Sequence, residues 1–94
     1  MRLNNKEKKI IKENTKKIFG EAKIILFGSR IDDNKVGGDI DLYIIPKNKD
    51  NLFIKKLKLK AILEDLLFKP VDIIIARNEN RLIEKEAKKG ISLN

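Results

Sequence analysis

The chain contains no cysteine and no histidine, and these two absences remove several kinds of chemistry. Without cysteine it has no disulfide, no thiolate nucleophile and no thiolate metal ligand. Without histidine it has no imidazole metal ligand and no Ser-His catalytic pair. Any catalysis must therefore use carboxylates, hydroxyls, lysines or arginines.

Large apolar features are also scarce. Tryptophan is absent, aromatic residues make up 5% of the 94 residues, and no long uncharged apolar run occurs. A transmembrane helix needs about 20 predominantly apolar residues, and the charged N-terminal stretch has no signal-peptide pattern. We expect one soluble cytoplasmic domain over residues 1–94, with no membrane partner.

The charge balance is strongly basic. With 22 Lys and Arg against 14 Asp and Glu, the formal net charge is +8. An acidic partner such as a nucleoside triphosphate, a nucleic acid or an acidic protein would suit this charge. Interleaved lysines and glutamates are equally typical of solvated helix faces. Nucleic-acid binding without catalysis is disfavoured, because four Phe and one Tyr, mostly at core-like positions, form no clear stacking platform.

Hydrophobic periodicity predicts six elements in the order α-β-β-α-β-α. Helices are expected over about residues 5–19, 51–68 and 80–89, and strands over residues 22–27, 39–45 and 71–76. The short connection between the first two strands and the long helix before the third predict a small mixed β-sheet with helices packed on it, in the α/β (α+β) class.

Two helices have more specific expectations. Asp50 is the expected N-cap of the second helix. That helix is expected to be the main core element, through Phe53, Leu57, Leu59, Ile62, Leu63, Leu66 and Leu67. On the last helix, Leu82, Ile83 and Ala87 are expected to point inward.

Three aspartates lie on predicted strands, where acidic residues usually need a reason. Asp39 and Asp41 alternate, so both point to one face with Cα atoms about 6.5–7 Å apart. Asp72 opens the third strand and joins them if that strand is a neighbour, at a spacing of about 4.8 Å. Three close anions need a cation, and oxygen ligands without His or Cys favour Mg²⁺ or Mn²⁺. Two such ions serve phosphoryl and nucleotidyl transfer.

The turn after the first strand offers groups for a phosphate. Gly28 has no Cβ, so backbone N–H groups can approach a phosphate closely. Ser29 adds an N–H and a hydroxyl, and Arg30 can add a bidentate contact. Without the carboxylates, both Gly28 and Ser29 would be equally well explained as turn residues.

Together, "GSRIDDNKVGGDIDLYII" and the later "VDIII" resemble the signature of the DNA polymerase β-type nucleotidyltransferases: Gly-Ser, a spacer, Asp-x-Asp, and a third Asp on a following strand. The chain is most similar to the minimal nucleotidyltransferase (MNT) group, over nearly its whole length. By this resemblance Gly28 and Ser29 bind the triphosphate, Asp39 and Asp41 hold two Mg²⁺ ions, and Asp72 ligates the catalytic ion and helps to activate the attacking hydroxyl.

The resemblance also implies a reaction and a partner. The expected reaction moves AMP from ATP to a hydroxyl, here a tyrosine of a HEPN-domain toxin, which makes the chain an antitoxin. The family's usual Gly-Ser-Arg-Ala-Arg-Gly and Ser-Asp-x-Asp differ from this loop, which lacks the second Arg and has Gly38 instead of Ser. This difference leaves an alternative open, in which the domain neutralises a partner by contact alone.

Competing interpretations of the loop are weaker. "DDNKVGGDIDL" is not a calcium loop, because Val36 and Tyr43 occupy positions that need oxygen ligands and strands flank it. Tyr43 shares the face of the two aspartates and is expected to pack in the core. Lys35 is expected to be one of many surface lysines. No particular dimer interface is evident, so homo-oligomerisation is left open.

Overall fold

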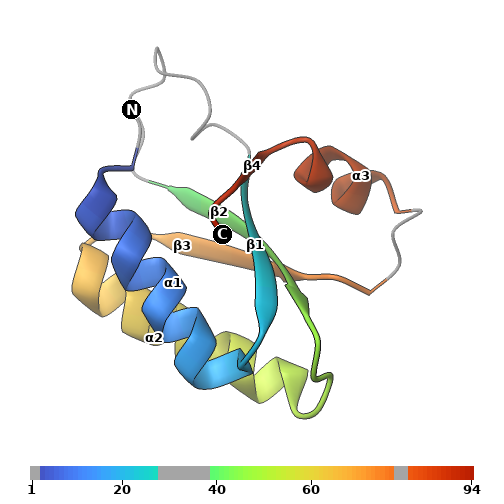
Figure 1. The fold of residues 1–94 in the computed structure, drawn as a ribbon, viewed down its shortest axis with the longest axis horizontal. Helices are drawn as coiled ribbons and strands as arrows, with labels where there is room; N and C mark the ends of the chain where they lie inside the picture. The colour runs from blue at the N-terminus through green and yellow to red at the C-terminus, as the bar shows by residue number, and fades with distance from the viewer. Residues whose placement is uncertain (1–2, 28–38, 78–80) are drawn as a thin grey trace.

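The computed structural model describes residues 3–27, 39–77 and 81–94. Seven elements follow one another along these ranges (Figure 1). They are α1 (Asn5–Phe19), β1 (Ala22–Phe27), β2 (Ile40–Pro46), α2 (Leu52–Leu67), β3 (Val71–Ile75), α3 (Leu82–Lys88) and β4 (Ile91–Ser92). The expected order of six elements is confirmed, with bounds that differ by one or two residues, and β4 is an addition.

The four strands form one mixed sheet in the order β3-β2-β1-β4. The hairpin partners β1 and β2 are antiparallel, as are β1 and β4, whereas β2 and β3 are parallel. Helix α2 makes the crossover that a parallel pair requires. The expected mixed sheet is therefore confirmed, and β3 forms one of its edges.

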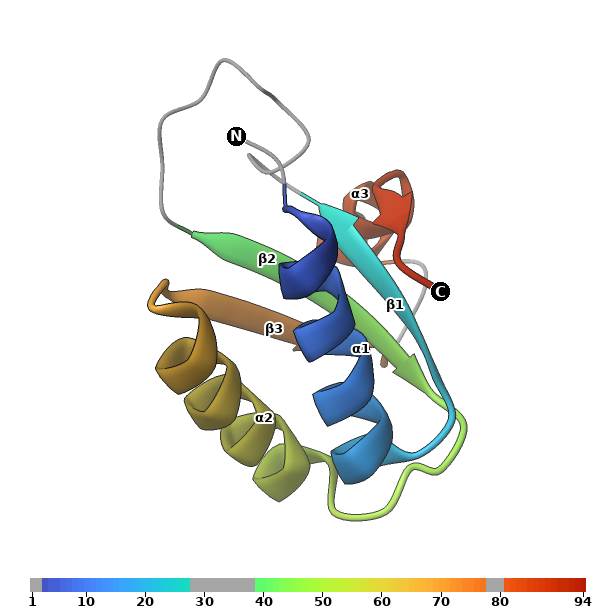
Figure 2. The ribbon, with the colours of Figure 1, turned by 60° about the vertical axis from the view of Figure 1, so that its left-hand side comes forward.

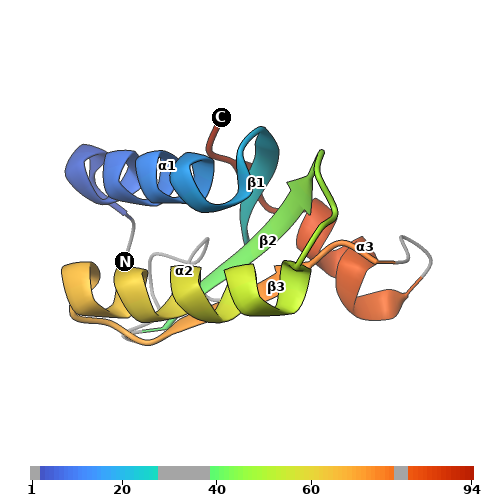
Figure 3. The ribbon, with the colours of Figure 1, turned by 90° about the horizontal axis from the view of Figure 1, so that it is seen from below.

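The two faces of the sheet carry different helices. Figure 2 shows α1 and α2 in front of the strands and α3 behind them, and Figure 3 shows α1 and α2 side by side. Alternation along β2 sends Ile40, Leu42 and Ile44 into the larger core beneath α1 and α2. Tyr43 faces the other way, into a smaller core that includes Ala87 of α3.

Helix α1 begins and ends where its sequence indicates. Asn4 and Glu7 form a capping box, in which each side chain accepts a hydrogen bond from the other residue's backbone N–H. Gly20 ends the helix with φ +76°, a value that L side chains rarely adopt. Lys69 ties the helix to the α2–β3 turn through a 2.8 Å ion pair with Glu7.

Helix α2 follows only part of its prediction. It begins after Asn51, which is left-handed and makes no side-chain cap, so the prediction of Asp50 as N-cap is wrong. One stripe enters the core, through Leu59, Leu63 and Leu67. The remaining apolar residues of the prediction, which lie on other sides of the helix, are exposed: Phe53, Leu57, Ile62 and Leu66.

The last helix has a different inward face from the one expected. Ala87 is buried as predicted, but Leu82 is 80% exposed and Ile83 is 45% exposed. The residue buried beside Ala87 is Glu84. After α3 the chain adds β4 to β1 and returns Leu93 to the core, where its N–H donates to Ile24 O at 2.8 Å.

No helix in the described ranges has both the length and the apolar content that crossing a membrane would require.

Candidate functional site

The candidate site lies where three strand ends meet. Since β1 runs antiparallel to β2 and β2 runs parallel to β3, the end of β1 lies beside the starts of β2 and β3. In register, Phe27 pairs with Asp41 and Asp41 pairs with Asp72. Adjacent strands lie about 4.8 Å apart. The sequence left open whether the third strand neighbours the second. The structure shows that it does, and the register places Asp72 beside Asp41.

The aspartates lie on the face of the sheet away from α1 and α2. Ile40 and Leu42 are buried in the larger core, so Asp39 and Asp41 are on the opposite face. Asp39 precedes β2 and is exposed, and Asp41 is partly buried. Asp72 also faces away from that core, and its side chain is 67% exposed. This end of the sheet therefore presents carboxylates to solvent.

A lysine from α2 reaches Asp72 around the edge of the sheet. The Nζ atom of Lys60 lies 3.8 Å from Oδ1 of Asp72 and 3.1 Å from Oε2 of Glu64. It also donates to the carbonyl oxygen of Val71, while the N–H of Val71 donates to Oε2 of Glu64 at 2.9 Å. The hydrogen bond from the backbone N–H of Val71 lowers the pKa of Glu64 most, and the hydrogen bond from the side chain of Lys60 lowers it further.

The side chains at this end of the sheet are of the kind that binds a divalent cation. Carboxylates without imidazole or thiolate are the donors that Mg²⁺ and Mn²⁺ prefer, and adjacent register brings two of them together at Asp41 and Asp72. Within residues 3–27, 39–77 and 81–94, no three acidic side chains gather closely enough to hold a metal ion. The donor chemistry fits, and Lys60 supplies positive charge beside Asp72.

The proposed phosphate-binding residues lie outside the described part of the chain. These residues are Gly28, Ser29 and Arg30. Their roles stay predictions from the sequence. Lys35, which is expected to be a surface lysine, also lies outside that part.

Tyr43 packs in the core, as expected, and has a polar partner. Its side chain is fully buried, and its hydroxyl donates to Oε1 of Glu84 at 2.9 Å. Glu84 also accepts from the N–H of Arg77 at 2.9 Å, and its Oε2 lies 3.6 Å from Arg81. A buried carboxylate needs such donors because desolvation otherwise penalises its charge.

Sequence reasoning missed Lys60, Glu64 and Glu84. The spacing of Lys60 and Glu64 by four residues on a helix was a visible signal, since such residues are neighbours on a helix surface. Their contacts with β3 were not visible, because they depend on how α2 crosses the sheet. Glu84 gave no signal, because its partner Tyr43 lies 41 residues away in the sequence.

Solved structures from Shewanella oneidensis share this fold. One is a chain of tri-AMPylated Shewanella oneidensis HEPN toxin in complex with MNT antitoxin, with 21% identity, a TM-score of 0.76, and coverage of 98% of this chain and 72% of that one. The other is a crystal structure from Shewanella oneidensis with 19% identity, a TM-score of 0.74 and the same two coverages. At 21% and 19% sequence identity, this similarity shows a shared fold. No curated protein matches the sequence.

A family comparison covers nearly the whole chain. Residues 5–94 match the model described as polymerase beta, nucleotidyltransferase. The match includes all four strands and the three aspartates of the candidate site. The chain therefore belongs to the polymerase beta nucleotidyltransferase family.

Proposed function

We propose that this protein is an Mg²⁺-dependent nucleotidyltransferase that moves AMP from ATP to a tyrosine hydroxyl of a HEPN-domain toxin, and so acts as its antitoxin. The observation that carries the proposal is the pairing of Asp41 with Asp72 at the open end of two parallel strands, with Asp39 on the same face. Family membership supports the reaction class. The structural neighbour, a complex of HEPN toxin with MNT antitoxin, supports the partner.

Each residue has a defined part in this proposal. Asp41 and Asp72, which lie beside each other in register, would hold the cations together with Asp39, and the charge of the cations would stabilise the reacting phosphate and the leaving oxygen. Gly28 and Ser29 bind the triphosphate through backbone N–H groups. Asp72 also orients the acceptor hydroxyl and takes its proton.

The reaction balances without any further reactant. The acceptor oxygen forms a bond to the α-phosphorus of ATP, and the bond between this phosphorus and the oxygen that bridges to the β-phosphate breaks. Pyrophosphate leaves with the bonding electron pair, and the hydroxyl proton passes to a carboxylate oxygen. Because Asp39 and Asp72 are exposed, the acceptor protein can reach the aspartates and supply the rest of the site with its own surface.

Incubation with α-labelled ATP and Mg²⁺ tests the proposal, with and without the HEPN-domain partner. The unmodified protein is expected to label the partner. The double variant Asp39→Asn/Asp41→Asn is expected to lose transfer by roughly 100-fold or more, because the carboxylates can no longer hold the ions. Asp50→Asn/Asp65→Asn is the matched control, since it removes the same charge at two exposed positions and should keep full transfer.

A second candidate function is inhibition by contact alone. It is favoured by the absence of a three-carboxylate group among the described residues and by the ion pair that Lys60 makes with Asp72. In that case the double variant would silence the HEPN partner as well as the unmodified protein does, and no label would appear with either. If the unmodified protein labels the partner and the double variant does not, inhibition by contact alone is excluded.

A further inference from the structure

Helix α2 buries one side and leaves the opposite side uncovered. Its buried residues are Leu59, Leu63 and Leu67. Ile54, Leu57 and Ala61 are exposed and recur three and four residues apart, so they share a different side of the helix. Figure 2 shows α2 at the border of the molecule, with α1 beside it and no other described helix on its outer side. These three residues, with Phe53 and Phe68 at the two ends, form the outer stripe.

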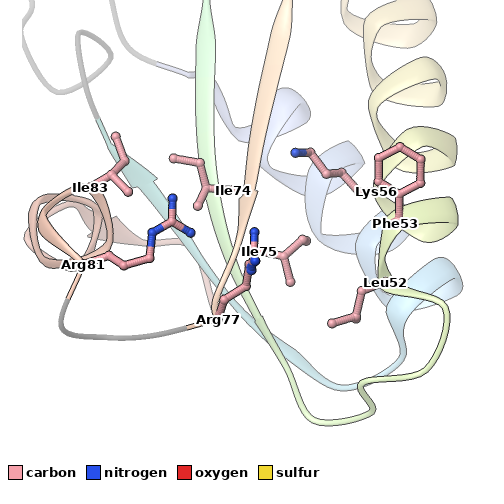
Figure 4. A pocket seen from close by; sticks show the side chains of 8 residues that line it. All are labelled: Leu52, Phe53, Lys56, Ile74, Ile75, Arg77, Arg81 and Ile83. Atoms are coloured by element: carbon pink, nitrogen blue, oxygen red, sulfur yellow. The ribbon is translucent and has the colours of Figure 1, made fainter.

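The outer stripe is apolar and open to solvent. Phe53 is 71% exposed, Ile54 56% and Leu57 48%. Phe53 also borders a pocket of about 450 Å³ beside the end of β3, between α2 and α3. The basic residues that line this pocket are Lys56, Arg77 and Arg81 (Figure 4). Contiguous exposed apolar surface of this kind is typical of an interaction site.

Phe68 indicates that this side of α2 has a partner. It ends the helix with a φ of 56°, and it is 89% exposed. Helices usually place glycine or asparagine at such a left-handed position, because a Cβ there is strained. Phenylalanine therefore adds strain at this position and gains almost no burial from the described chain. A partner that covers the phenyl ring accounts for its presence.

The charges of α2 are ordered against the dipole of the helix. Four lysines lie in its first nine residues, and Glu64 and Asp65 lie in its last four. The helix dipole favours the reverse order, with acidic residues near the N-terminus and basic residues near the C-terminus. An antiparallel helix with the same charge order would place its acidic end beside these lysines, and its lysines beside Glu64 and Asp65. A second copy of α2 is such a helix.

Both flanks of the outer stripe are complementary to those of a second copy. Lys58 and Asp65 are exposed, lie on one flank about two turns apart, and form no ion pair within the described part of the chain. A two-fold axis beside Ala61 would put Lys58 opposite Asp65 of the second copy, and Asp65 opposite its Lys58. On the other flank it would bring Lys60 near Glu64 of the second copy. A parallel pair would instead oppose like charges, which disfavours association.

We propose that two copies of this chain associate through their outer stripes, with the two α2 helices antiparallel about a two-fold axis at Ala61. The small side chain of Ala61 lets the helices approach closely at the centre. Toward each end, Phe68 of one copy packs on Phe53 and Ile54 of the other. The ion pairs along the flanks fix the antiparallel direction.

The association is expected to be weak. One pair of short helices buries less than the roughly 1,200 Å² of a stable complex, and the net charge of +8 on each copy opposes association. Charges more than about 8 Å apart are screened at physiological ionic strength, so the contacts at the stripe decide. We expect dimers at protein concentrations of about 0.1 mM and above. At low micromolar concentration the protein is then monomeric, and a change at Asp65 affects neither transfer nor stability.

The dimer leaves the candidate catalytic end free. Asp39, Asp41 and Asp72 lie on the face of the sheet away from α1 and α2, so both copies keep their aspartates accessible. The association does not depend on the transfer reaction, and it is measured without nucleotide or Mg²⁺. A failure of transfer and a failure of association are therefore separate results.

Sedimentation equilibrium of the whole protein tests the proposal by charge reversal. Lys58→Asp and Asp65→Lys each oppose like charges at two symmetric points, so each is expected to weaken association by about tenfold or more. The double variant Lys58→Asp/Asp65→Lys restores opposite charges and should associate as the unmodified protein does. A mixture of the two single variants should also recover association. Lys85→Asp is the matched control, because Lys85 is exposed on α3 and should not affect association.

A single cysteine tests the position of the two-fold axis. The chain has no cysteine of its own, so Ala61→Cys can form a disulfide only with the same residue of a second copy. A disulfide needs Cα atoms within about 7 Å, which two helices with axes about 8–10 Å apart allow at their point of contact. Ala61→Cys is therefore expected to cross-link on mild oxidation. Lys85→Cys is the control and should cross-link much more slowly.

Several results would overturn the proposal. These are a protein that stays monomeric up to about 1 mM, equal association of the single and double charge variants, and cross-linking of Ala61→Cys no faster than the control. A monomeric chain that binds the HEPN-domain partner or anionic vesicles, and loses this binding on Leu57→Glu, would show that this other occupant covers the stripe instead.

Discussion

The hydroxyl of Tyr43 donates a 2.9 Å hydrogen bond to Glu84, and both side chains are fully buried. This contact joins the central strand β2 to α3. Through Glu84 it also engages Arg77 and Arg81, which flank the pocket beside β3. The buried pair therefore holds the start of α3 and the residue after β3 against the sheet.

Tyr43→Phe should lower the free energy of unfolding by about 1–3 kcal/mol, because Glu84 stays buried and loses a donor. Urea unfolding measures the change. Glu86→Gln is the control on the same helix, since Glu86 is exposed and forms a surface ion pair with Lys89, and it should alter the stability by less than about 0.5 kcal/mol. Equal stability of Tyr43→Phe and the unmodified protein would show that Glu84 finds another donor.

The hydrogen bonds to Glu64 predict a pH dependence of stability. The N–H of Val71, and then Lys60, hold its pKa below the ordinary value of 4.5. A lowered folded-state pKa stabilises the protein fully above the unfolded-state pKa, and this contribution is lost as the pH falls through the folded-state pKa. Glu64→Gln should therefore be less stable than the unmodified protein at pH 7, and the difference should shrink below a pH of about 4.5.

Urea unfolding of both proteins over a pH series checks this dependence. Asp65→Asn serves as control, because Asp65 is the exposed neighbour on α2. A stability difference for Glu64→Gln that stays constant down to pH 3 would mean that the side-chain change itself is responsible and the ionised carboxylate is not.

Gly90 and Gly20 should respond differently to a methyl group. A Cβ at Gly90 would overlap the carbonyl oxygen of Leu26 and lie 2.9 Å from Cγ2 of Ile25. Since this oxygen belongs to the backbone of β1, relief requires movement of the chain around β4, and Gly90→Ala should lower the stability by about 2 kcal/mol or more. A Cβ at Gly20 meets nothing within 4 Å.

Gly20→Ala should therefore cost only the strain of its backbone conformation, about 1–3 kcal/mol. Thermal unfolding of the two variants in parallel compares them. A Gly90→Ala variant as stable as the unmodified protein would show that α3 and β4 do not approach β1 as closely as the structure indicates.

Thr15→Val should raise the stability. The Oγ1 atom of Thr15 is buried within α1 and has no hydrogen-bond partner among the described residues. Valine keeps the shape and removes the unsatisfied group, so a gain of about 1 kcal/mol in the free energy of unfolding is expected. Thr15→Ser keeps the hydroxyl and loses a methyl group, and it should be less stable than the unmodified protein in the same urea experiment.

The sequence by itself determined the elements and their order through local patterns. The capping residue Asn4 was not needed to see α1, because apolar spacing and Gly20 already marked it. The alternation of Asp39 and Asp41 placed both on one face, since strand geometry requires this. The aspartates, the Gly-Ser turn and their spacing also sufficed to indicate the family, because the chemistry needs these residue types in this order.

Only the tertiary structure decided which faces are covered. The sequence shows Leu57 and Leu59 as equally apolar, but α2 packs on the sheet through one stripe, so Leu59 is buried and Leu57 is exposed. The same holds for α3, where Glu84 is buried and Leu82 is exposed, because Tyr43 provides a hydrogen-bond donor in the opposing sheet.

The pairing of strands likewise lay beyond local patterns. The register of Asp41 with Asp72, the addition of β4 to β1 and the edge position of β3 all depend on contacts between residues far apart in the chain. Periodicity reports which way a side chain points from its own strand, and it carries no information about the neighbouring strand. The pocket formed by Lys56, Arg77 and Arg81 arises for this reason from the assembled sheet and helices, and from no single motif.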